Sequence, residues 1–212
     1  MTRGLFISIE GGDGAGKSTQ VALLCRRLED AGRDVVSTRE PGGTSLGDRL
    51  RDLVKGGADP TPRAELLMFE AARAELVERV ITPALERGAT VVTDRFADSS
   101  LAYQAYGRGL DLEAVRDLNS FATGGMMPDL TVLLDAPPDI GGSRASGRDG
   151  GAGSGRRFEE QPEEFHRRVR QGYLALAKAE PHRWLVVDAT KPAERVADVI
   201  WQRVSQLLSD RA

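Results

Sequence analysis

The stretch Gly11-Gly12-Asp13-Gly14-Ala15-Gly16-Lys17-Ser18 follows the apolar run Leu5 to Ile9 and matches the pattern G-x-x-x-x-G-K-[ST]. Glycines at such positions let backbone N–H groups point toward phosphate oxygens without steric penalty. A helix starting near Lys17 would add partial positive charge, the Lys17 ammonium would reach the β- and γ-phosphates, and the Ser18 hydroxyl could ligate Mg²⁺. Because a strand precedes the motif and an amphipathic helix follows it, the stretch predicts a loop that binds the phosphates of Mg-ATP.

The rest of the chain alternates short apolar runs with helical stretches. Runs with the β-branched composition and flanking breakers of buried strands are Leu5 to Ile9, Asp34 to Thr38, Ala89 to Thr93, Leu130 to Leu134 and Trp184 to Val187. This alternation predicts an α/β fold, a single P-loop NTPase-type domain over residues 1–212 with a five-stranded parallel sheet and helices on both faces. Ligands are then expected at the carboxyl ends of the strands.

Composition indicates an ordinary globular protein. With 212 residues, of which 40% are hydrophobic and 29% charged, the chain can bury a sizeable core. A net charge of -3 gives no reason to expect a nucleic-acid partner or a membrane surface. The single cysteine, Cys25, cannot form an internal disulfide, and no apolar stretch approaches the length of a membrane span. We therefore expect a cytoplasmic protein.

One segment departs from this alternation. From Ser143 to Arg157 the chain reads SRASGRDGGAGSGRR, which offers almost nothing to bury. It is either a solvated surface loop or a mobile lid, at about residues 141–160, whose arginines close over phosphates. Its position between a strand and an amphipathic helix argues against a plain interdomain linker.

A metal bound at the phosphate loop needs a carboxylate from another strand end. Asp94 and Asp135 each follow an apolar strand and qualify by position, and Arg95 places a cation directly after Asp94. We therefore predict Ser18 and Asp94 as the metal ligands. No N-K-x-D motif for reading guanine occurs in the chain, which disfavours a GTPase.

A second group of polar and aromatic residues has the composition of an acceptor pocket. Phe69 and Arg73 lie four residues apart in one helical stretch, and Ser100 and Gln104 lie four apart in another, with Tyr103 beside them. Phe69 and Tyr103 taken singly are equally compatible with core packing. The cations that would complete the pocket are Arg39, Arg51 and Arg95. An aromatic wall, amide and hydroxyl groups and guanidinium clamps together suit a base that bears a phosphate.

Four motifs in this region carry a family resemblance. They are Thr38 to Thr44 (TREPGGT), Leu67 to Arg73 (LMFEAAR), Asp94-Arg95-Phe96, and Ser99 to Gln104 (SSLAYQ). In these motifs and their spacing the chain resembles the thymidylate kinases of the bacterial type, over nearly its whole length. The resemblance implies transfer of the γ-phosphoryl group of ATP to dTMP, giving dTDP and ADP, with Mg²⁺ as cofactor and a homodimer as the assembly.

The resemblance also implies roles for the acceptor side. Phe69 would stack on thymine, and Tyr103 would crowd the 2′ position of the sugar. Arg73, Ser100 and Gln104 would bind the polar edge of the base. Asp13 would meet the 3′-hydroxyl, and Arg51 and Arg95 would hold the acceptor phosphate. The full set of dTMP-binding residues implied is Asp13, Glu40, Pro41, Arg51, Phe69, Arg73, Arg95, Ser99, Ser100, Tyr103 and Gln104.

On the donor side the resemblance implies a set of ATP-binding residues and a catalytic set. The ATP-binding residues are Gly11, Gly12, Asp13, Gly14, Ala15, Gly16, Lys17, Ser18, Thr19, Arg144 and Lys191. The catalytic residues are Asp13, Lys17, Arg95 and Arg148. Some family members carry an arginine where this chain has Gly14, so lid arginines should supply that charge. The glycine-rich insert from Gly150 to Gly155 leaves open whether Arg148 or Arg157 approaches the transferring phosphate.

The acceptor phosphate is already ionised, so the mechanism needs positioning and charge neutralisation rather than a general base. Two other classes remain open: a kinase for another monophosphate or small acceptor, and a nucleotide-dependent switch that hydrolyses ATP without an acceptor. Stimulation of ATP consumption by individual monophosphates separates all three. Apolar residues that could form the dimer interface, or equally the core, are Leu118, Phe121, Met126 and Met127.

Overall fold

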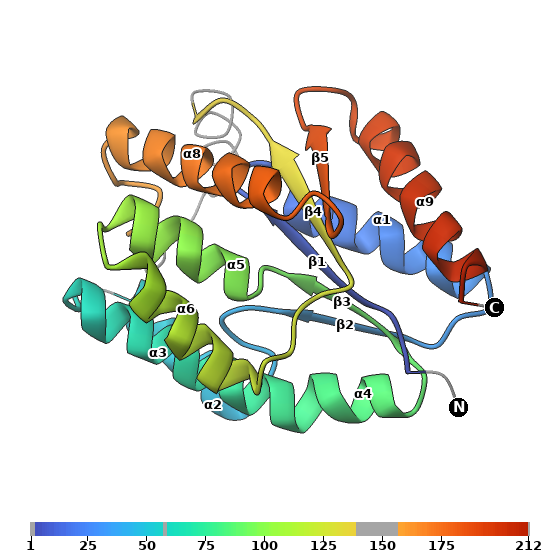
Figure 1. Cartoon of the computed structure of the whole chain (residues 1–212), viewed down its shortest axis with the longest axis horizontal. Helices are drawn as coiled ribbons and strands as arrows, with labels where there is room; N and C mark the ends of the chain where they lie inside the picture. The colour runs from blue at the N-terminus through green and yellow to red at the C-terminus, as the bar shows by residue number, and fades with distance from the viewer. Residues whose placement is uncertain (1–2, 57–58, 139–156, 212) are drawn as a thin grey trace.

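The computed structural model describes residues 3–56, 59–138 and 157–211 (Figure 1). Its strands are all parallel and form one sheet in the order β2-β3-β1-β4-β5. They are β1 (Phe6–Gly11), β2 (Val35–Arg39), β3 (Thr90–Asp94), β4 (Leu130–Asp135) and β5 (Trp184–Asp188). The five-stranded parallel sheet predicted from the sequence is thus confirmed. Each strand extends past its predicted apolar run, β1 by two residues and the other four by one.

Helices surround this sheet and connect its strands. They are α1 (Lys17–Asp30), α2 (Ser45–Lys55), α3 (Pro62–Leu76), α4 (Thr82–Glu86), α5 (Ala97–Ser100), α6 (Leu112–Thr123), α8 (Glu163–Ala179) and α9 (Ala193–Ser209). Two wide π-helical turns, η1 (Val77–Ile81) and η2 (Leu101–Gly107), continue α3 and α5 without a break in direction. No helix among the described residues is long and apolar enough to cross a membrane.

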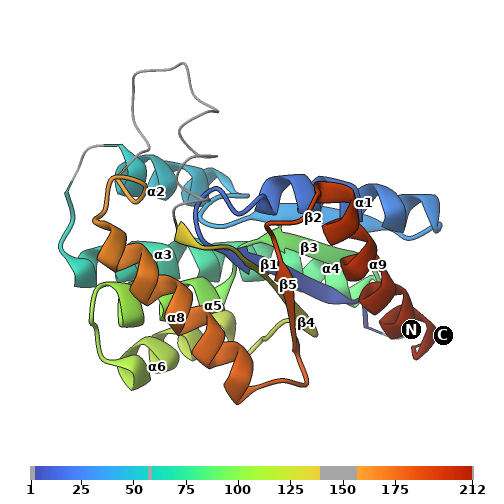
Figure 2. The same ribbon diagram turned by 90° about the horizontal axis from the view of Figure 1, so that it is seen from above.

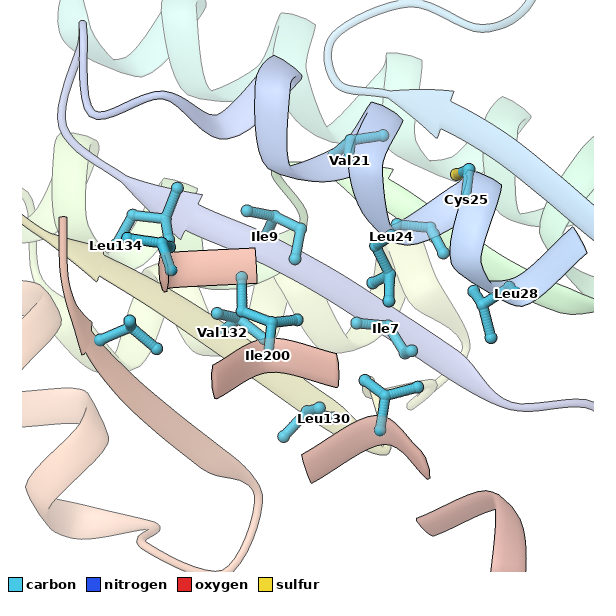
Figure 3. Close-up of a cluster of buried hydrophobic side chains, with 14 of the residues drawn as sticks. Ile7, Ile9, Val21, Leu24, Cys25, Leu28, Leu130, Val132, Leu134 and Ile200 are labelled. Carbon is cyan, nitrogen blue, oxygen red and sulfur yellow. The ribbon is translucent and has the colours of Figure 1, made fainter. Parts of the chain in front are cut away.

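The sheet is covered on both faces (Figures 1 and 2). Helices α1 and α9 pack together over one face, where Leu24 and Ile200 meet Ile7, Ile9 and Val132 of the strands (Figure 3). The other face is covered by α8, by α5 with η2, and by the run from α3 through η1 to α4. Each fully buried side chain of this size contributes about 1.5–3 kcal/mol to the free energy of folding.

Side chains along β1 alternate between the two faces of the sheet, and the strand runs from the core to the site. Ile7 and Ile9 point into the α1–α9 layer, whereas Phe6 packs on the opposite face with Phe96 at a ring distance of 4.9 Å. Glu10 follows on that same opposite face and is completely buried. The register pairs Ile9 with Asp94, so β1 and β3 end beside each other. The carboxyl ends of the strands therefore deliver polar residues to one edge of the sheet.

Candidate active site

The loop between β1 and α1 has the backbone that its glycines predict. Gly11, Gly14 and Gly16 adopt positive φ angles of 142°, 73° and 94°. A side chain at Gly11 would bring its Cβ within 2.6 Å of the Leu134 carbonyl oxygen, so this position requires glycine. Helix α1 begins at Lys17, as predicted. We call this loop, together with Asp94 and Arg95, the phosphate end of the site.

Lys17 is held inside the phosphate loop. Its Nζ atom donates hydrogen bonds to the carbonyl oxygens of Gly11 at 3.2 Å and Gly12 at 2.8 Å. Burial, and secondarily the Arg95 guanidinium, lowers the pKa of Lys17 to about 8. Negative charge brought into the loop would reverse part of this shift, because an opposite charge stabilises the protonated amine.

Ser18 and Asp94 form the donor set that suits Mg²⁺ at this end. The Ser18 hydroxyl donates to the Asp94 carboxylate at 2.9 Å, and both are hard oxygen ligands of the kind that Mg²⁺ prefers. Asp135, the alternative from the sequence, is engaged by Arg170 through two hydrogen bonds of 2.7 and 2.9 Å. The residues present therefore fit a magnesium ion, which Ser18 and Asp94 would hold.

Arg95 is the centre of the polar network at the end of β3. It is the only non-glycine residue with a positive φ, 74°, in the described part of the chain. Its guanidinium donates to the Asp13 carboxylate and to the Tyr103 hydroxyl, each at 2.8 Å. Burial opposes the ionised form of Asp13, but Arg95 and Lys17 prevail and lower the pKa of Asp13.

Glu10 supports this arrangement from beneath, and nothing in the sequence pointed to it. Its buried carboxylate accepts hydrogen bonds from the Phe96 N–H at 2.7 Å, the Ser99 hydroxyl at 2.6 Å and the Tyr173 hydroxyl at 3.0 Å. Ser99 and Tyr173 in turn accept from Arg95 at 3.2 and 3.1 Å. Burial, reinforced by Asp98, raises the pKa of Glu10 to about 7. Glu10 thus fixes both the backbone and the side chain of the Arg95 turn.

A cavity of about 270 Å³ opens beside the phosphate loop. All eleven of the predicted dTMP-binding residues line it, together with Lys17, Ser18 and Asp94. Arg39, expected as one of the pocket's cations, lines it too, and the lining residues that were not predicted are Lys55, Phe158 and Glu159. Lys55 is the last residue of α2. Its presence in the site could have been suspected from the sequence only because lysine is rare in this arginine-rich chain, which has four.

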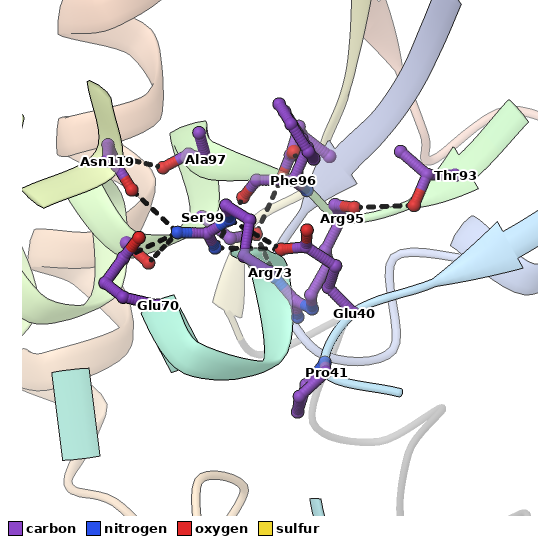
Figure 4. A network of polar contacts seen from close by, with 12 residues as sticks. Glu40, Pro41, Glu70, Arg73, Thr93, Arg95, Phe96, Ala97, Ser99 and Asn119 are labelled. Atoms are coloured by element: carbon purple, nitrogen blue, oxygen red, sulfur yellow. Dashed lines mark hydrogen bonds and ion pairs between the residues drawn. The ribbon is translucent and has the colours of Figure 1, made fainter. Parts of the chain in front are cut away.

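The far side of the cavity, which we call the base end, is built on a buried arginine (Figure 4). Arg73 is 1% exposed and donates to the carboxylates of Glu40 at 2.9 Å and Glu70 at 2.6 Å. It also donates to the Ser100 hydroxyl at 3.1 Å and to the Asn119 side-chain carbonyl at 2.7 Å. Burial alone would lower the pKa of Arg73, but its two carboxylate partners raise it above its usual range.

Two further base-end residues complete the wall. Phe69 is half-buried and stands 6.0 Å from the Phe158 ring, centroid to centroid. Gln104 is 2% exposed, and its Nε2 atom donates to the Glu65 carboxylate at 2.9 Å. Glu65 and Asn119 were not predicted, because each acts through a partner distant in sequence. Glu70 stands three residues before its partner Arg73, inside a quoted motif, and had been given no role.

The remaining predicted residues are Lys191 and the lid arginines. Lys191 is exposed, pairs with Asp188 at 3.5 Å and does not line the cavity. Arg144 and Arg148 lie outside the described residues, as does most of the predicted lid. Arg157 donates to Glu65, to Asp59 at 3.2 Å and to the Pro60 carbonyl at 3.0 Å, which directs it to the start of α3 rather than to the phosphate loop.

A second hollow lies on the other side of the phosphate loop. It measures about 300 Å³ and is bounded by the end of β4, by α8 and by loop residues that include Gly12 and Asp13. His166, half-buried, lines it and packs edge-on against Phe165 at 5.5 Å. The phosphate loop therefore borders two cavities, and Asp13 lines both of them.

A glycine-rich phosphate loop that opens a helix, with a basic and aromatic cavity at the same sheet edge, defines the class of P-loop phosphotransferases acting on nucleotides. The family model described as thymidylate kinase matches residues 9–200. The chain therefore belongs to the thymidylate kinase family.

Named relatives agree with this assignment. The thymidylate kinase of Deinococcus radiodurans is 53% identical over 207 residues, which is 97% of this chain and 98% of that protein. The thymidylate kinase of Thermomicrobium roseum is 50% identical over 203 residues, 96% of this chain and 95% of that protein. The crystal structure of thymidylate kinase from Ehrlichia chaffeensis superposes with a TM-score of 0.78 at 33% identity, and covers 96% of this chain and 99% of that one.

Proposed function

We propose that the 270 Å³ cavity binds dTMP while the loop from Gly11 to Ser18 binds the phosphates of Mg-ATP. As a thymidylate kinase, the enzyme phosphorylates dTMP to dTDP with ATP as the phosphoryl donor, a step in dTTP synthesis. The two sites share residues at the Arg95 guanidinium. Arg95 and Asp13 border both the phosphate loop and the cavity, so a phosphate in each would meet at the Arg95 guanidinium.

The cavity offers each part of dTMP a matching group. Phe69 presents an aromatic face for thymine, and Arg73, Ser100 and Gln104 present polar groups for its edge. Tyr103 closes the floor beside Asp13 by donating a hydrogen bond of 3.1 Å to it, and this contact supports a role for both residues at the deoxyribose. The acceptor phosphate lies between Arg95 and Arg51, with Lys55 and Arg39 adding positive charge.

Phosphoryl transfer at this site requires no general base, because the attacking oxygen belongs to an ionised phosphate. Lys17 and Arg95 neutralise the charge that spreads over the transferring group, and Asp13 orients Arg95. Ser18 and Asp94 would hold Mg²⁺, which would supply further charge neutralisation. Arg144 and Arg148 are proposed to add the adenine contact and a lid arginine, and Lys191 to support the adenine. Near-normal turnover by Arg148→Ala would remove that residue from the catalytic set.

The test is ADP release from Mg-ATP, first without acceptor and then with dTMP, dUMP, dCMP, AMP and GMP in turn. Strong stimulation by dTMP, weaker stimulation by dUMP and little by the others is the expected result. ATP hydrolysis without an acceptor would favour the switch class, and preference for another monophosphate would overturn the roles given to Phe69, Tyr103 and Gln104.

We further propose a cytoplasmic homodimer. Phe121 in α6 is 89% exposed and Leu67 in α3 is 55% exposed, and these two helices pack against each other. Large apolar side chains exposed on adjacent helices are typical of an interface. Sedimentation of the wild type and of Phe121→Glu tests it, with a shift from dimer toward monomer expected in the variant.

A further inference from the structure

A buried carboxylate orients the amide of Gln104 at the base end. Glu65, in the first turn of α3, is completely buried, and the Gln104 Nε2 atom in η2 donates to its Oε1 atom at 2.9 Å. A carboxylate that receives donors on both oxygens only accepts hydrogen bonds. The NH₂ group of Gln104 must therefore face Glu65, and its carbonyl oxygen is left for the cavity that Gln104 lines.

Glu65 is itself fixed by two guanidinium groups. Arg108 donates to Oε1 through Nε at 3.2 Å and to Oε2 through Nη2 at 3.1 Å. Arg157 donates to Oε2 as well. Among the described residues, four donors reach this carboxylate, and three of them are guanidinium N–H groups, which cannot become acceptors. Of these four, only the Gln104 amide could reverse its direction.

We propose that Glu65 is a specificity-determining residue, which selects thymine or uracil over cytosine by holding the Gln104 carbonyl oxygen toward the base. The inference rests on the proposed binding of dTMP in this cavity. The N3 atom of thymine carries a hydrogen that can be donated to the Gln104 carbonyl oxygen, whereas the N3 atom of cytosine is an acceptor. Two acceptors facing each other in a buried pocket are left without hydrogen bonds, and such mismatches give strong discrimination.

Glu65→Gln tests the orientation directly. The new side chain must place its own NH₂ group at one of the two former oxygen positions. At the Oε2 position it would face two guanidinium groups, from Arg108 and Arg157, and neither can yield. At the Oε1 position it would face one guanidinium N–H and the Gln104 amide, which can turn over. The substitution is therefore expected to reverse Gln104 and present its NH₂ group to the base.

The measurement is kcat/KM for dTMP and for dCMP. The wild type is expected to prefer dTMP strongly, and Glu65→Gln to reduce the ratio of the two kcat/KM values by about 10–100-fold. Asp98→Asn is the matched control, because Asp98 is a buried carboxylate paired with Arg183 at 2.7 and 2.8 Å and does not line the cavity. It should lower stability and leave the ratio unchanged. Equal loss for both substrates in Glu65→Gln would overturn the inference.

Two further comparisons separate positioning from general damage. Glu65→Asp keeps an acceptor of shorter reach, so its ratio should lie between those of the wild type and Glu65→Gln; a ratio at or below that of Glu65→Gln would count against the inference. Calorimetric binding of thymidine and deoxycytidine, without ATP, should show the same change of preference, and an unchanged preference would contradict it. A wild type that does not prefer dTMP to dCMP would overturn the proposed function, and the inference with it.

Discussion

The two ends of the site are built in opposite ways. At the phosphate end, the loop from Gly11 to Ser18 takes its shape from consecutive residues, with backbone groups and one lysine arranged by glycines at positive φ. Asp94 and Arg95 join this loop from the end of β3. The base end is assembled from side chains far apart in sequence, such as Arg73 and Asn119, 46 residues apart, and Glu65 and Gln104, 39 apart. At the base end, buried carboxylates and arginines hold one another in place. We therefore expect substitutions at the phosphate end to reduce turnover, and those at the base end to reduce stability as well.

Lys17→Ala should give the largest effect. Loss of the ammonium is expected to lower kcat on the order of 10³-fold, because a charged donor to the transferring group is removed. Its unfolding free energy should change by less than about 1 kcal/mol, since the fold already disfavours the charged form of Lys17. Steady-state kinetics, calorimetric dTMP binding and denaturant unfolding provide the three readouts. Loss of dTMP binding together with turnover would contradict the division between the two ends.

Arg73→Gln is the complementary variant. Removing this guanidinium leaves Glu40 and Glu70 buried without their cation, which should cost about 4 kcal/mol of unfolding free energy. Affinity for thymidine should fall as well, because the base loses a donor. Denaturant unfolding of Arg73→Gln and of Lys17→Ala under the same conditions compares the two losses of stability directly. A stability equal to that of Lys17→Ala would show that the base end is not held by its ion pairs.

The buried carboxyl group of Glu10, beneath the phosphate end, should make the stability of the fold depend on pH. Its pKa is raised from 4.5 to about 7 on folding, so the folded protein binds this proton more tightly than the unfolded chain does. Raising the pH through this interval therefore destabilises the fold, by at most about 3 kcal/mol for this group. Glu10→Gln cannot lose the proton, so its unfolding free energy should fall less than that of the wild type between pH 5 and pH 8. Parallel pH profiles for the two proteins would refute this.

Phe69→Leu should give the smallest effect. The residue is half-buried, and leucine retains most of its apolar volume, so stability should remain within about 1 kcal/mol. Loss of the aromatic face should weaken thymidine binding by roughly 5-fold, in line with the value of an aromatic stacking contact. Calorimetry with thymidine measures it. A loss as large as that of Arg73→Gln would mean that stacking, rather than the ion-pair network, dominates the base end.

The contrast between the two ends also explains what the sequence could predict. The strands and the phosphate loop were predictable because their signals are local: apolar runs, glycine spacing and a helix start at Lys17. The hydrogen bonds of Glu10, Glu65 and Asn119 depend on residues brought together only by folding. The π-helical turns were missed because apolar periodicity over five to seven residues does not separate a wide turn from an α-helix.

Selection for stability and selection for activity make different demands on position 95. Its backbone at φ 74° is one that glycine adopts freely and other residues adopt at a cost of about 1–2 kcal/mol. Random variants selected only for heat resistance should carry glycine at this position if the relieved backbone strain exceeds the loss of the hydrogen bonds that Arg95 donates to Asp13 and Tyr103. Variants chosen for growth that depends on dTTP would be required to keep the arginine. The residue found at position 95 after many generations would then show which of the two selections a population had undergone.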